Sequence, residues 1–232
     1  MNHVVAVVTG GGRGVGAATA MRLASRGLRV VVSARSESEL AATEGAIAAL
    51  HGADRVCRVA CDVSDAREVE RLAQVATRFA GDAGVHVLVN NAGIAPRAFV
   101  HEMDEAMWDA VLDVNLKGTW LCTRAFLPGM LARRAGRIVN VGSISSTLGT
   151  ARMSAYCAAK WGVVGFTKSV AEETRGLGVQ AVAVLPGSID TRMLEGSGFD
   201  AQMTADEVAR TIEFLALDAA PAITGSAVEM FG

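Results

Sequence analysis

Residues 4–16, VVAVVTGGGRGVG, join an uninterrupted apolar run to a turn that holds five glycines. Such an apolar run is typical of a parallel strand that is buried on both faces. A helical pattern follows at 17–26 and ends at Gly27, and a second apolar run lies at 30–32. Strand, glycine turn, helix and strand within about thirty residues predict one βαβ unit.

The same alternation continues along the chain. Ser36 with Glu39 and Thr204 with Glu207 have the spacing of capping boxes at two helix starts. Seven strands and six helices without an internal repeat predict one α/β domain over 1–232, a Rossmann fold with a doubly wound, parallel seven-stranded sheet and helices on both faces. Further helices are expected at 36–50, 66–79, 105–134, around 156–160 and at 204–217, and further strands at 56–60, 85–89, 137–141, 179–185 and 227–230.

Composition excludes several classes of protein. A formal net charge of −2 without a long basic run gives no electrostatic footprint for nucleic acid. No run approaches the ~20 apolar residues of a membrane span, and the first residues lack a signal-peptide pattern, so we expect a cytoplasmic protein. The cysteines show no paired CxxC spacing, which favours free thiols and no metal site. These are Cys57, Cys61, Cys122 and Cys157.

In a doubly wound sheet, ligands bind beyond the carboxyl ends of the strands. The glycine turn lies at such an end, where helix amides and the positive end of the helix can meet a pyrophosphate. An isolated glycine cluster is as often a flexible loop. Its place directly after the first strand favours a dinucleotide.

The glycines at 10, 14 and 16 have GxxxGxG spacing, preceded by Thr9 and followed by Asn90-Asn91-Ala92-Gly93, Ser143 and the pair Tyr156 and Lys160. In these motifs, across nearly its whole length, the chain resembles the short-chain dehydrogenase/reductase family. The resemblance implies a nicotinamide dinucleotide. Gly12 replaces a serine that is common in relatives. The cofactor-binding residues that it implies are Gly10, Gly12, Arg13, Gly14, Val15, Arg35, Asp62, Val63, Asn91, Ala92, Gly93, Tyr156, Lys160, Pro186, Gly187, Ile189 and Thr191.

Two arginines bear on the choice of cofactor. Relatives that prefer NAD have an acidic residue at the end of the second strand, where this chain has Arg35. Arginine can pair with a 2′-phosphate that a carboxylate would repel. Arg13 inside the glycine turn adds a second positive charge. Together they favour NADP(H), although either alone could be a solvated surface residue.

Tyr156 and Lys160 are four residues apart, which places a phenol and an ammonium on one helix face. Taken alone, such a pair is most often a solvated surface pair. The resemblance implies that Tyr156 exchanges the proton, while Lys160 lowers the phenol pKa and binds the nicotinamide ribose. It further implies that Ser143 orients the carbonyl and that Asn115 anchors a proton-relay water.

The predicted function is reversible hydride transfer between NADPH and a ketone or secondary alcohol. The alternatives are an NAD-dependent alcohol dehydrogenase of the same fold and a non-catalytic NADP(H)-binding sensor or interaction module. The chain looks nearest to 3-oxoacyl-[acyl-carrier-protein] reductases. Arg134 matches one carrier-docking arginine, but Leu177 replaces the other, with Arg175 two residues away.

The substrate is expected to be a small or acyl-tethered carbonyl compound with an apolar body. A short, pliable lid is predicted at 192–203, since Gly196 and Gly198 lie within it. Family members are usually tetramers, so a homotetramer or homodimer is implied. Candidate residues of the substrate wall are Ser145, Leu148, Thr150, Met153 and Ser188.

Overall fold

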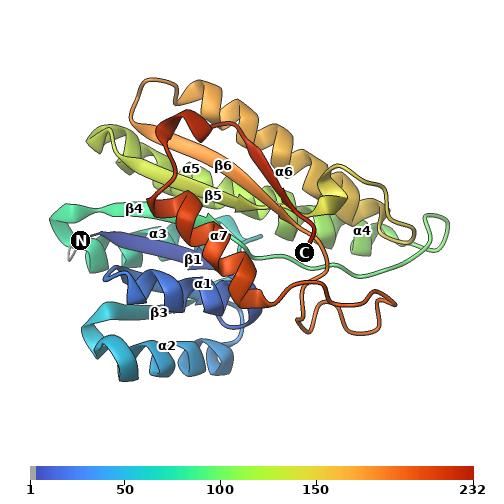
Figure 1. Ribbon diagram of the computed structural model, residues 1–232, viewed down its shortest axis with the longest axis horizontal. Helices are drawn as coiled ribbons and strands as arrows, with labels where there is room; N and C mark the ends of the chain where they lie inside the picture. Colours follow the sequence, from blue (N-terminus) through green and yellow to red (C-terminus); the bar gives the residue numbers. More distant parts are fainter. Residues whose placement is uncertain (1–3) are drawn as a thin grey trace.

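The protein, described over residues 4–232 by a computed structural model, is built on one seven-stranded parallel sheet (Figure 1). The strand order is β3-β2-β1-β4-β5-β6-β7. Successive strands are added towards one edge of the sheet up to β3 and towards the other edge from β4 onwards, so the switch point lies between β1 and β4. The predicted fold class is confirmed. The strands are β1 Val5–Thr9, β2 Arg29–Ala34, β3 Val56–Ala60, β4 Val85–Asn90, β5 Gly136–Val141, β6 Val179–Pro186 and β7 Ala227–Met230.

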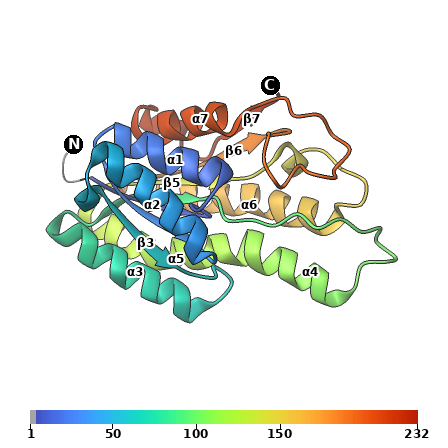
Figure 2. The same ribbon diagram turned by 90° about the horizontal axis from the view of Figure 1, so that it is seen from below.

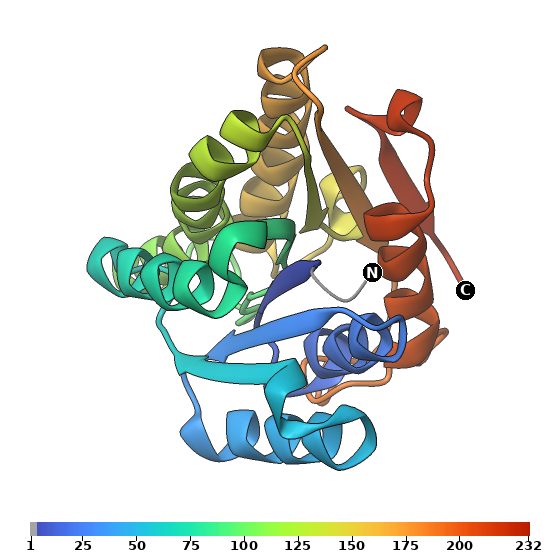
Figure 3. The ribbon, with the colours of Figure 1, turned by 90° about the vertical axis from the view of Figure 1, so that its left-hand side faces the viewer.

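Helices cover both faces of the sheet, α1, α2 and α7 one face and α3, α5 and α6 the other (Figures 2 and 3). Side chains of β1 alternate between two buried clusters, because successive residues of a strand point to opposite faces. This explains the continuous apolar run. The helices are α1 Gly14–Ser25, α2 Glu37–His51, α3 Ala66–Ala80, α4 Glu105–Leu112, α5 Gly118–Arg133, α6 Ser154–Glu173 and α7 Ala205–Leu217.

Three expected elements differ in detail. α1 begins at Gly14 rather than at 17, since the Ala17 amide already bonds to the Arg13 carbonyl. The helical stretch 105–134 contains a π-helical turn at Asp113–Lys117. Ser36 caps α2, but the box is not reciprocal, because the Glu39 carboxylate pairs with arginines instead. The Thr204 and Glu207 box is confirmed.

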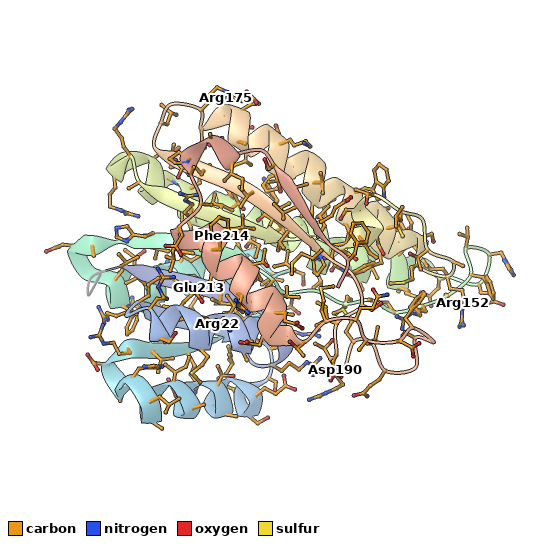
Figure 4. The ribbon with its side chains drawn as sticks, viewed as in Figure 1. Arg22, Arg152, Arg175, Asp190, Glu213 and Phe214 are labelled. Atoms are coloured by element: carbon orange, nitrogen blue, oxygen red, sulfur yellow. The ribbon has the colours of Figure 1, made fainter. Side chains whose placement is uncertain are left out.

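Ion pairs tie α1 to α7 on one face of the sheet. Arg22 pairs with Asp206 and Glu213, and Arg26 pairs with Glu213 and Asp218. Figure 4 shows Arg22 and Glu213 facing each other from the two helices. This contact holds α7 in place, and with it the end of the long loop that precedes α7.

Candidate active site

A cleft of about 1160 Å³ opens where the strands end. It is lined by the segments that follow β1, β2, β3, β4, β5 and β6, as expected for a doubly wound sheet. The structure brings every predicted site residue to this one cleft. They are Gly10, Gly12, Arg13, Gly14, Val15, Arg35, Asp62, Val63, Asn91, Ala92, Gly93, Asn115, Ser143, Tyr156, Lys160, Pro186, Gly187, Ile189 and Thr191.

The glycine turn forms a cradle free of side chains at the start of α1. Gly10 and Gly14 have φ of 64° and 52°, in the left-handed region that favours glycine. A Cβ on Gly16 would lie 2.1 Å from the Gly10 carbonyl oxygen. No side chain caps α1, so its first amides are free of side-chain hydrogen bonds. These features fit the pyrophosphate of a dinucleotide.

Thr9 fixes the segment after β4 against this turn. Its hydroxyl accepts hydrogen bonds from the amides of Asn91 and Ala92, at 3.0 and 3.1 Å. The Asn91 side chain donates to the carbonyls of Thr9 and Gly10. Asn91 therefore supports the turn with its side chain, a role that the sequence did not reveal.

The π-helical turn presents Asn115 to the cleft. Its Nδ2 donates to the carbonyls of Ile94 and Val111, both at 2.9 Å, while its buried Oδ1 has no hydrogen-bond partner. Single π turns inside α-helices occur frequently at functional sites. A Cβ on Gly93 would lie 2.7 Å from that Oδ1 and 3.7 Å from Lys160 Nζ. The free acceptor thus lies beside Gly93 and close to the lysine.

Ser143, Tyr156 and Lys160 lie at the other end of the cleft, and all three are buried. The Lys160 ammonium donates to the Val141 carbonyl at 2.8 Å and lies 5.6 Å from the centroid of the Tyr156 ring. Ser143 Oγ accepts from the Ser145 amide at 3.1 Å and caps a short 3₁₀ turn. Ser143 therefore caps this turn and also lines the cleft.

Burial dominates the protonation of this group. It raises the pKa of Tyr156 to about 12, against the opposing effect of the Ser143 hydroxyl. Burial also lowers the pKa of Lys160 to about 8. The expected lowering of the phenol pKa by Lys160 is not found in the protein alone, because the ammonium is engaged by Val141 and desolvation outweighs attraction at this distance.

The polar end of the cleft contains a carboxylate that sequence reasoning assigned only to a helix cap. Glu39 Oε1 lies 2.9 Å from Arg13 Nη1 and 3.2 Å from Arg192 Nη2. Arg35 lies 3.9 Å from Asp62. Burial opposes the ionisation of Asp62, but hydrogen bonds from Ser64 and the charge of Arg35 together lower its pKa. Both predicted arginines thus have acidic neighbours.

All five predicted wall residues line the cleft, two of them apolar and three of them hydroxyl-bearing. Sequence reasoning missed Arg97, which also lines it from the segment after β4. No periodicity or motif marks Arg97, so only the spatial path of that segment reveals it. The wall residues are Ser145, Leu148, Thr150, Met153 and Ser188.

The segment 188–203 forms a loop closed at its base. The Ser188 carbonyl accepts from the amides of Gln202 and Met203, at 3.0 and 3.1 Å, and the Asp190 amide donates to Met203. Gly196 and Gly198 have φ of 67° and 78°, in the left-handed region that favours glycine. Five residues between 193 and 202 of this loop line the cleft, namely Met193, Leu194, Glu195, Phe199 and Gln202.

Over residues 4–232, the helices are too short or too polar to cross a membrane. Within the same range, no three His, Cys, Asp or Glu side chains are grouped so as to hold a metal ion. All four cysteines are free thiols.

The sheet order, the uncapped glycine turn and the buried phenol and ammonium define a doubly wound α/β protein, with a glycine turn at one end of its cleft and two buried titratable groups at the other. The family model for short chain dehydrogenases matches residues 4–201. The chain therefore belongs to the short-chain dehydrogenase/reductase family, whose members are oxidoreductases that bind a nicotinamide cofactor.

Curated relatives match along nearly their whole length. A 3-oxoacyl-[acyl-carrier-protein] reductase of Synechocystis sp. is 40% identical, over 98% of this chain and 95% of the relative. A cis-4-hydroxycyclohexanecarboxylate dehydrogenase of Sinomonas cyclohexanicum is 39% identical, over 98% and 95%. The crystal structure of levodione reductase superimposes with a TM-score of 0.92 at 30% identity, covering 100% of this chain and 97% of that one.

Proposed function

We propose that this chain is an NADP(H)-dependent oxidoreductase that interconverts a ketone and a secondary alcohol. The observation that carries the proposal is the burial of Ser143, Tyr156 and Lys160 together at one end of the cleft whose other end is the uncapped glycine turn. One end is suited to phosphates and the other to proton exchange. A single cleft therefore offers both halves of a hydride-transfer reaction.

The chain's own groups suit the two halves of a dinucleotide. The amides of the glycine turn and of Val15 would hold the pyrophosphate, and Asp62 and Val63 would lie along the adenine. Lys160 would bond to the nicotinamide ribose, while Pro186, Gly187, Ile189 and Thr191 would hold the carboxamide. The bound nicotinamide supplies or accepts the hydride.

Tyr156 is the proton donor in the direction of reduction. Since burial raises its pKa to about 12, the phenol is protonated at neutral pH and ready to donate. Ser143 orients the carbonyl oxygen and stabilises the negative charge that builds on it. The free Oδ1 of Asn115 accepts a hydrogen bond from a water that returns the proton towards Lys160.

Arg13 and Arg35 support NADP(H) as the cofactor. Neither guanidinium is buried, so both can turn to a 2′-phosphate. Glu39 favours a second candidate, NAD dependence, because its carboxylate pairs with Arg13 and Arg192 at this end of the cleft and would repel that phosphate. The two candidates, NADP(H) dependence and NAD dependence, belong to the same reaction class and differ only in the dinucleotide.

The substrate is a ketone with an apolar body that packs on Leu148 and Met153, under the 192–203 loop as a lid. The names of the relatives supply a starting panel of a 3-oxoacyl thioester, a cyclic diketone and 4-oxocyclohexanecarboxylate. The carrier-docking hypothesis has weaker support. Arg134 donates to the Gly176 carbonyl and Arg175 pairs with Glu172, at the amino ends of β5 and β6 (Figure 4).

The enzyme acts as a homotetramer or homodimer. Three large aromatic side chains support this, since Trp108, Trp120 and Trp161 are exposed on α4, α5 and α6. Exposed aromatic groups of this size are enriched at interfaces between protein chains.

Tyr156→Phe tests the function. Tyr156 is the only tyrosine in the chain, so an ultraviolet difference titration reports its ionisation alone. Turnover with NADPH should fall about 10²- to 10⁴-fold in this variant while NADPH binding, followed by fluorescence, stays within about twofold. Cys157→Ala, on the next residue of α6, is the control and should keep its activity. Full turnover by Tyr156→Phe on a good substrate would disprove the mechanism.

A further inference from the structure

Four arginines line the cleft, and three of them have a carboxylate beside them. Arg13 and Arg192 share Glu39, and Arg35 lies beside Asp62. Within residues 4–232, Arg97 has no ion pair and no side-chain hydrogen bond. Its Nε is buried without a partner. Buried donors are nearly always paired in proteins, so Arg97 needs an explanation.

The backbone around Arg97 is held at two points. The Ile94 carbonyl accepts from Asn115 at 2.9 Å, and the Ala98 amide donates to the Arg152 carbonyl at 3.0 Å. Ile94 and Ala95 pack on the cluster that contains Tyr156. Arg97 is therefore fixed over the reacting end of the cleft, and not over the end with the glycine turn.

Within residues 4–232, no carboxylate of the protein pairs with the Arg97 guanidinium. Asp190 and Glu195 line the cleft but are exposed on the 188–203 loop, and neither pairs with Arg97. In Figure 4, Asp190 lies on the loop before α7, whereas Arg152, whose carbonyl bonds to the Ala98 amide next to Arg97, lies on the loop before α6. The cofactor phosphates belong to the far end, beside the glycine turn. The unmatched charge is therefore available to the substrate.

We infer that Arg97 binds a carboxylate of the substrate, so that the enzyme's substrates are oxo acids with an apolar body between the carbonyl and the acid. This rests on the proposed function and names its substrate class. A guanidinium has a planar fork of donors that matches the two oxygens of a carboxylate. Apolar wall residues such as Leu148 and Met153 suit the body, and Arg97 suits the acidic end.

The Arg97 charge also reaches the phenol. Burial raises the pKa of Tyr156, and Arg97 opposes that rise. At pH 7 the phenol is protonated whether or not Arg97 is present. Reduction assays at pH 7 therefore isolate the effect of Arg97 on the substrate from its effect on the proton donor.

The test compares 4-oxocyclohexanecarboxylate with its methyl ester, with NADPH at pH 7. The wild type should prefer the acid in kcat/KM. Arg97→Met should lower kcat/KM for the acid about 10- to 100-fold, as loss of a charged hydrogen bond implies, and change that for the ester less than twofold. Arg97→Lys should recover part of the loss. Arg152→Met is the control, because Arg152 is exposed on Phe99 and does not line the cleft.

Equal losses for acid and ester, or no preference for the acid in the wild type, would overturn the inference. Calorimetry with cyclohexanecarboxylate, which cannot react, separates it from the proposed function. If cyclohexanecarboxylate binds and its binding depends on Arg97, but no ketone is turned over, the carboxylate site is supported and the proposed reductase function is refuted. If the ester is turned over but cyclohexanecarboxylate does not bind, the reductase function is supported and the carboxylate site is refuted.

Discussion

Replacing Lys160 by methionine should stabilise the protein while it abolishes turnover. Lys160 is only 4% exposed, and its ammonium has a single protein partner, the Val141 carbonyl. Burial lowers its pKa from 10.5 to about 8, so at pH 7 the folded protein holds a charge that water would solvate better. Methionine has a similar length and carries no charge.

The size of the gain follows from the pKa. A pKa lowered from 10.5 in the unfolded chain to about 8 in the folded one corresponds to about 3 kcal/mol of lost stability when the lysine is charged in both states. The loss is complete below the folded pKa of about 8 and disappears as the pH rises to 10.5, because the unfolded chain then also releases its proton. Subtracting about 1 kcal/mol for the hydrogen bond to Val141 leaves a net gain of about 2 kcal/mol at pH 7.

Urea unfolding and thermal unfolding of wild type and Lys160→Met at pH 7 and pH 10 measure this directly. At pH 7 the variant should be more stable, with a Tm about 4–8 °C higher, and the advantage should shrink at pH 10. Lys168→Met is the control, since Lys168 is exposed on the same helix and should show neither change. A variant that is less stable than wild type at pH 7, or equally shifted at both pH values, would refute the reasoning.

Two further substitutions probe the cofactor end. Gly16→Ala would place a Cβ 2.1 Å from the Gly10 carbonyl oxygen. NADPH affinity should therefore fall more than about tenfold, and the free energy of unfolding should fall by about 2 kcal/mol. Gly45→Ala is the control, because Gly45 has open space around it on α2, and its free energy of unfolding should rise by about 0.5–1 kcal/mol. Calorimetry and urea unfolding measure both variants. Glu39→Gln should lower KM for NADPH about two- to fivefold by releasing Arg13, and leave KM for NADH unchanged. Steady-state assays with both cofactors decide, and an equal fall for NADH would contradict it.

The order of elements could be predicted from the sequence because both faces of this sheet are buried. The central strands β1, β2 and β4 then become short apolar runs, and the glycine turn fixes the first crossover. Helix starts were less certain. The start of α1 at Gly14 is missed because two of its first three residues are glycines, which helix patterns count as a loop. The π turn around Asn115 leaves no mark in periodicity, since the apolar pattern of the long helix continues through it.

Motif spacing was enough to predict which residues line the cleft, but it could not reveal which contacts hold them in place. Thr9 pins the segment after β4, and Asn90 bonds to Asn140, which bonds to Thr167 on α6. These contacts join residues that are 27–82 positions apart, as only the folded sheet can. The same holds for Glu39, whose role is set by Arg13 and Arg192 rather than by its own helix.

Tyr156 and Lys160 show why spacing alone does not describe the surroundings of a titratable pair. Spacing on a helix suggests attraction between phenolate and ammonium, but both groups are buried, and burial favours the neutral form of each. At pH 7 the phenol, with its pKa near 12, keeps its proton, while the lysine, with its pKa near 8, is still mostly charged. The folded chain thus holds at neutral pH the phenolic proton that reduction of a ketone would consume.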